Sequence, residues 1–176
     1  MLPDIDIRLY NVIKAIEQVI LPSIPKDEKL AQEQASLSVG HIKLVLEQWR
    51  FAGDFERGSL MGLVALSDRL LEEASSQIVP QLREELIEKV SEIKNSSNES
   101  YEVSTSFVRS LGNLIDKVIL QDDTTSPLPV QIMNAVLDYG EIQAKRERVW
   151  FKGNGLDPDR HTLPDIADII GLKKPD

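Results

Sequence analysis

Two segments of this sequence carry polar side chains at positions where a helix should be apolar. In the first, residues 26–52, apolar residues recur at about 100° per residue, the period of an amphipathic helix. Its predicted apolar face consists of Ala31, Leu37, Ile42, Leu44, Val45 and Trp49, and Gln34, Ser38, His41 and Gln48 fall inside that face. Because a buried polar group without a partner costs about 1–3 kcal/mol, we expect another helix, a water molecule or a ligand to meet these side chains.

The second segment, residues 127–150, repeats the pattern. Leu128, Ile132, Val136 and Ile142 mark its apolar face, and Tyr139, Gln143 and Arg146 lie inside that face. Two helices would then contribute inward polar groups, and the interior of a helical bundle is a usual place for a ligand site. The candidate ligand-binding residues are Gln34, His41, Gln48, Tyr139, Gln143 and Arg146.

Two interpretations of these six residues stay open. In one, they line a pocket for a small anionic or carbonyl-bearing molecule, with the Arg146 guanidinium as a fixed positive fork. In the other, which the sequence favours, they satisfy one another as a structural polar network. In either case we expect the ring of His41, which has Leu37 and Val45 one turn away, to be largely buried.

The functional hypotheses follow from the same residues. The first is a non-catalytic binding or accessory protein, because the sequence shows no recognisable catalytic constellation. The alternative is an enzyme that acts on an anionic or acyl small molecule, with His41 as acid or base beside Arg146 and Tyr139.

The sequence gives little support for a metal site, a catalytic nucleophile or a phosphate-binding loop. The sequence has no cysteine, which excludes disulfides, thiolate metal sites and a cysteine nucleophile. No Glu-x-x-His pair, Gly-x-Ser-x-Gly elbow or glycine-rich phosphate loop occurs. Asp157, Asp159 and His161 alternate as in a cation loop but lack its further acids, so we interpret them as a turn. The sequence therefore predicts no metal and no cofactor.

Charge and hydropathy narrow the class of partner. The formal net charge of −9 disfavours nucleic acid, which is bound mainly through Lys and Arg. The basic run Lys145, Arg146, Arg148 and Lys152 is typical of a helix C-terminus, where cations interact favourably with the helix dipole. No apolar run approaches the roughly 20 residues of a membrane span, and residues 1–6 do not resemble a signal peptide. We expect a cytoplasmic protein that binds neither nucleic acid nor membrane.

The elements that position these residues are helices, because every apolar run has a 3.6-residue period. We predict an all-α fold: an antiparallel helical bundle of five to six helices in one domain, residues 1–176, with an ordered irregular tail, residues 151–176, packed on the bundle. The predicted helices cover residues 2–21, 26–52, 54–74, 81–93, 101–120 and 127–150, and a short closing helix covers 165–170. Their predicted caps and breaks are Asp4, Gly53, Asp54, Pro80, Ser126 and Pro127.

The third predicted helix raises the question of a partner subunit. Leu60, Val64 and Leu71 fall outside its main apolar stripe, so either flanking helices or a second copy must cover them. We expect a homodimer. Gly58 and Gly62 lie one turn apart on the same helix and would let a neighbouring backbone come close.

The residues Val19-Ile20-Leu21-Pro22, followed by Leu30-Ala31-Gln32-Glu33-Gln34-Ala35, resemble the opening of small bacterial all-helical proteins of no established function. The resemblance covers about a quarter of the chain. It implies a bacterial cytoplasmic origin and assigns no catalytic residue.

Overall fold

The computed structural model describes residues 4–97, 100–121 and 129–170. It is 83% helical, with six helices of eleven residues or more and no strand among the described residues, which confirms the predicted all-α class. Contacts divide the chain into two compact units, residues 1–50 with 147–169 and residues 51–146 with 170–176. The single domain stays a prediction.

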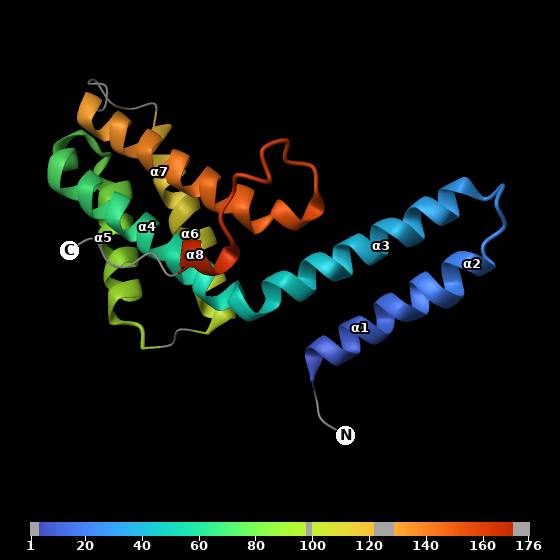
Figure 1. Cartoon of the computed structure of the whole chain (residues 1–176). Coiled ribbons are helices and arrows are strands. Elements are labelled where there is room, and N and C mark those ends of the chain that lie inside the picture. The colour runs from blue at the N-terminus through green and yellow to red at the C-terminus, as the bar shows by residue number, and fades with distance from the viewer. Residues whose placement is uncertain (1–3, 98–99, 122–128, 171–176) are drawn as a thin grey trace. The chain divides into compact units, whose positions relative to one another are not determined.

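Unit 1 is built on a helical hairpin (Figure 1). Helix α1 (Ile5–Ala15) continues through a π-helical turn, η1 (Ile16–Ile20), into α2 (Leu21–Ser23), and α3 (Lys29–Gln48) returns beside it. The carboxylate of Asp4 accepts hydrogen bonds from the first turn of α1, at 2.9 Å from the Asp6 nitrogen, so the predicted N-cap is confirmed. At the other end of the hairpin, the Gln32 amide donates to the Pro25 carbonyl over 3.2 Å and ties the connection to α3.

The hairpin is held by a narrow seam. Ile13 of α1 and Val39 of α3 are its buried residues. The half-buried residues at three- and four-residue spacing on either side of them are Leu9, Ile16, Ala35, Ile42 and Leu46. This spacing is the heptad pattern of two helices that pack along one seam.

The seam corrects the apolar face predicted for residues 26–52. Ala31, Leu37 and Val45 were expected inside but are exposed, whereas Val39 is buried. A broad 100° arc is typical of a helix that packs on several neighbours. Within the hairpin α3 packs on one helix, so the buried stripe narrows and moves to the heptad positions.

The C-terminal part of unit 1 folds onto α3. The 3-10 turn η4 (Lys152–Asn154) brings Gly153 against Leu44 and Glu47, where a Cβ atom would not fit. The basic run holds this segment, because Arg148 forms a bidentate pair with Asp157 and the Lys152 amine lies 2.8 Å from Asp165. A short helix, α8 (Ile166–Ile170), confirms the predicted closing helix, and residues 171–176 lie outside the described residues.

Unit 2 contains α4 (Ala52–Glu73), α5 (Pro80–Asn95), α6 (Tyr101–Ile119) and most of α7 (Val130–Trp150). The predicted break at Ser75–Gln77 (η3) and the start at Pro80 are confirmed, and Ser100 caps α6 by accepting from the Val103 nitrogen. The predicted turn at Gly53 is wrong. A 3-10 turn, η2 (Trp49–Phe51), leads directly into α4, and Asp54 pairs with Arg57 over 3.1 Å inside the first turn. The predicted cap Ser126 and first position Pro127 lie outside the described residues.

One apolar cluster forms the core of unit 2. Its most deeply buried members, each almost wholly inaccessible to solvent, are Leu70, Leu86, Leu111, Val118 and Ile132. Leu60, Val64 and Leu71 pack against this cluster. The chain itself therefore covers the residues on which the homodimer prediction was based.

Among the described residues, no helix combines the length and the hydropathy needed to cross a membrane.

The burial of the seam predicts how two substitutions in α1 change the stability of the protein. Ile13→Ala removes a buried side chain and should lower the free energy of unfolding by about 2–5 kcal/mol. Ile7→Ala, on the same helix, changes an exposed isoleucine and should have an effect within about 0.5 kcal/mol. Thermal and urea unfolding of both variants measure the difference, and equal losses would contradict the seam.

Candidate functional site

Three of the six candidate residues meet on one side of α7 in unit 2. Tyr139, Gln143 and Arg146 are spaced four and three residues apart, so they share one helix face, and all three line a groove against α4. The facing positions of α4 are Gly58 and Gly62. The groove has a volume of about 270 Å³, and its apolar wall consists of Ala65, Leu66, Ala135 and Ile142.

The two glycines make room for side chains. A Cβ atom on Gly58 would lie 2.6 Å from Nη2 of Arg146, and one on Gly62 would lie 3.0 Å from a ring carbon of Tyr139. The sequence analysis expected a neighbouring backbone there. Long polar side chains from α7 fill the space instead, because their reach spans a wider gap between two helices than a backbone contact allows.

Arg146 is the most unusual residue of the site, since it is only 8% exposed. Its Nη2 donates to the carbonyl of Phe55 over 2.7 Å, and its guanidinium carbon lies 4.8 Å from the centroid of the Phe55 ring, a cation–π contact. Its Nε is also buried and has no acceptor among the described residues. A guanidinium has five N–H donors, so the protein leaves part of this hydrogen-bonding capacity unused.

A carboxylate in the first turns of α4 partly balances this charge. Burial lowers the pKa of Arg146, and Tyr139 and Glu56 act in the opposite direction. Burial also raises the pKa of Glu56 above its usual range, with Arg109 and Arg146 opposing that shift. Glu56 is therefore a counter-ion that is itself partly withdrawn from water.

A polar contact beside the groove joins α4 to α7. The hydroxyl of Ser59, a buried residue, lies 3.4 Å from the side-chain oxygen of Gln143 and 3.2 Å from the Phe55 carbonyl, and its one proton can be donated to either oxygen. Sequence analysis did not identify Ser59, Phe55 or Glu56 as site residues. The sequence did contain a signal for this side of the site. Small residues occur at positions 58, 59 and 62, and a row of long polar side chains occurs in residues 127–150.

The other three candidate residues lie on α3 in unit 1. Gln48 is half-buried, and its amide donates to the Trp150 carbonyl over 2.7 Å. Gln34 and His41 are exposed. The expectation of a buried His41 is therefore wrong, because the face of α3 that carries it is not the face that packs on α1.

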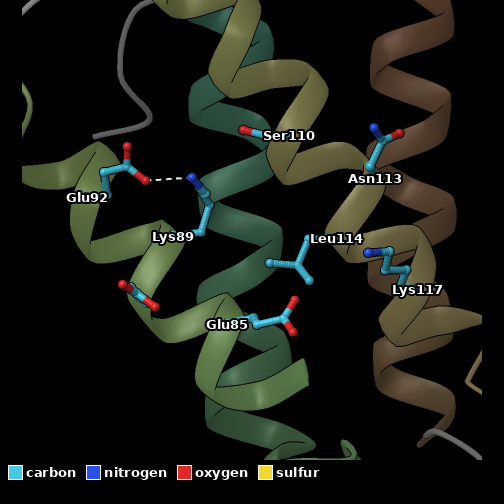
Figure 2. A pocket seen from close by; sticks show the side chains of 8 residues that line it. Glu85, Lys89, Glu92, Ser110, Asn113, Leu114 and Lys117 are labelled. Carbon is cyan, nitrogen blue, oxygen red and sulfur yellow. Dashed lines mark hydrogen bonds and ion pairs between the residues drawn. The ribbon is translucent and has the colours of Figure 1, made fainter. Parts of the chain in front are cut away.

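A second hollow in unit 2, of about 330 Å³, lies between α5 and α6 (Figure 2). Its α5 side carries Glu85, Lys89 and Glu92, and its α6 side carries Asn113 and Lys117. The Lys89 amine pairs with Glu92 within the hollow. Among the described residues no group of three or more His, Asp or Glu side chains is placed to hold a metal ion.

No family model matches this chain, and no curated protein or solved structure matches it either. Any function must therefore be argued from the geometry of the two units.

The fit between Gly58 and Arg146 can be tested with a matched pair of glycines. Gly58→Ala should displace the guanidinium, leave the Phe55 carbonyl without its donor and cost about 1–3 kcal/mol. Gly140 lies in α7 with open space around it, so Gly140→Ala should gain up to about 1 kcal/mol from helix propensity. Chemical denaturation measures both, and a stabilising Gly58→Ala would contradict the described packing.

The charge balance predicts a pH dependence. Because the folded state raises the pKa of Glu56, stability linked to its protonated form is present at low pH and lost as the pH rises through the folded-state value. Glu56→Gln should therefore stabilise the protein more at pH 7 than at pH 4, as seen in the melting temperature relative to the parent.

Glu141 is the matched control for this measurement. A hydrogen bond from Lys145 lowers its pKa, so Glu141→Gln should destabilise the protein more at pH 7 than at pH 4. Shifts of the same sign in the two variants would refute the assignment of Glu56.

Proposed function

We propose that this protein is a non-catalytic binding protein that acts as a homodimer and holds a small anionic molecule in the groove between α4 and α7. The observation that carries the ligand is the buried guanidinium of Arg146, whose Nε has no acceptor among the described residues. A purely structural network would be expected to satisfy such a group, because an unmet buried donor lowers stability. Arg146 lines the groove, so an oxygen of a ligand there can supply a further acceptor for the unused donors of its guanidinium.

The lining of the groove narrows the class of ligand. Four apolar residues form most of the wall, and Tyr139 and Gln143 add polar groups that can orient a carboxylate. Asp138 and Arg69 also line the groove, so their opposite charges largely offset each other there. The groove volume of about 270 Å³ lies just below the range typical of ligand sites and favours a small carboxylate with a short apolar chain.

A binding role is preferred to the enzyme alternative. An acid or base catalyst is usually tuned by burial and by neighbouring charges. His41 is exposed on α3, and no observation favours a reaction at its ring.

The proposal is tested with butyrate as the probe and butyramide, its neutral analogue, as the ligand control. NMR titration of the parent should show butyrate binding at least about tenfold tighter than butyramide, since a charge-assisted hydrogen bond contributes about 1.5–3 kcal/mol. Arg146→Gln should abolish this preference. Arg148→Gln, which removes an arginine in unit 1 that is paired with Asp157, should keep it.

Circular dichroism and thermal melts establish that both variants are folded before they are titrated. Equal binding of the two probes by the parent, or loss of binding in Arg148→Gln alone, would overturn the proposed ligand.

A further inference from the structure

The hairpin of unit 1 has two sides of different chemistry. If the seam residues are heptad positions a and d, the positions that flank them are e on one side and g on the other. In an antiparallel pair the two e rows lie on the same side. The ion pair between Glu17 and Lys43, both at e, has a length of 2.7 Å and places these rows together. Arg50, at the next e position and in the turn η2, pairs with Asp6, an a position of α1.

The g rows must then share the opposite side of the hairpin. We call this side the g face and define it by Ile5 and Val12 of α1 and Ala31, Ser38 and Val45 of α3. All five are uncharged and all five are exposed, with Ile5, Val12 and Val45 between 45% and 46%. Val19 and Ile20, in the π-helical turn that follows α1, add further exposed apolar surface.

An uncharged g row on both helices is unusual for an isolated pair. Two-stranded coiled coils carry Glu and Lys at e and g, whereas helices that pack in larger bundles are apolar at a, d and one of e or g. The e side of this hairpin carries the charges of Glu17, Lys43 and Arg50, whereas the g side follows the second rule. The hairpin therefore has the pattern of one half of a four-helix bundle.

We infer that the g face binds the g face of a second copy of this chain, so that two hairpins form a four-helix bundle. This inference deepens the homodimer of the proposed function by naming its surface, and it does not depend on the ligand. A two-fold axis makes such an interface self-complementary. The larger residues of α1 can then lie over the smaller Ala31 and Ser38 of the partner.

Charge and area both fit a second copy. Residues 1–50 contain seven acidic and six basic residues, so this part of the chain has a net charge near zero although the whole chain carries −9. Two hairpins can therefore approach without the repulsion that the rest of the chain would cause. The whole side of the hairpin that has the g face at its centre is about 30 Å long and about 20 Å wide, from helix rise and diameter. It offers about 600 Å² per copy, which reaches the lower limit of stable interfaces.

The experiment compares two double variants of the full chain by light scattering after size-exclusion chromatography. Val12→Glu with Val45→Glu places two charges on the g face. Ile7→Glu with Leu37→Glu is the matched control, because these residues are 53% and 56% exposed but lie outside the g and seam positions of the same two helices.

The parent and the control should have twice the 19.8 kDa mass of one chain at micromolar concentration, and the g-face variant should have the mass of one chain. Circular dichroism should show equal helix content in all three. A monomeric parent, a dimeric g-face variant or a monomeric control would each overturn the inference.

The titration with butyrate distinguishes a failure of the proposed dimer from a failure of the proposed ligand. Because the g face lies in unit 1 and the groove in unit 2, a monomeric g-face variant should still prefer butyrate to butyramide. Loss of that preference in the parent would refute the proposed ligand and leave the dimer in place.

Discussion

A guanidinium withdrawn from water is the constraint around which the α4–α7 side of unit 2 is arranged. Desolvation disfavours the charge, and the pKa of Arg146 is lowered accordingly. The surroundings compensate in three ways: a backbone carbonyl accepts from Nη2, an aromatic ring faces the cation, and a carboxylate lies near enough to interact. The guanidinium can occupy this position because residue 58 of α4 is a glycine, whose missing Cβ atom would overlap with it. A helix face with larger residues there would expel the charge and close the groove.

The hairpin of unit 1 is constrained by how little surface two helices can bury. Two helices alone can bury one narrow seam, so the residues on its flanks must either be charged or find a partner. The e side carries the ion pair of Glu17 with Lys43, whereas the g side has no charge at all. The charged e side can face water without a partner, whereas an uncharged g side is typical of a hairpin that packs in a larger assembly.

The errors in the sequence analysis have a common physical cause. A period of 3.6 residues locates a helix but does not tell how many neighbours it has, and the number of neighbours sets the width of its buried stripe. Leu37 and Val45 were assigned to the buried face because a wide stripe was assumed, and His41 was assigned with them. Gly53 was interpreted as a break, although a glycine costs a helix only about 1 kcal/mol, and here a 3-10 turn precedes it and α4 includes it.

The all-α class, the approximate bounds of most helices and the cap at Asp4 could be predicted from the sequence, because these follow from local periodicity and local hydrogen bonds. The sequence also identified the polar row of Tyr139, Gln143 and Arg146, since residues one turn apart on one helix must share a face. What that row contacts, a pair of glycines and the Phe55 carbonyl on α4, became known from the packing of the helices, as did the buried face of α3. Those outcomes depend on contacts between residues far apart in the chain, and the periodicity of a single helix contains no information about its partner.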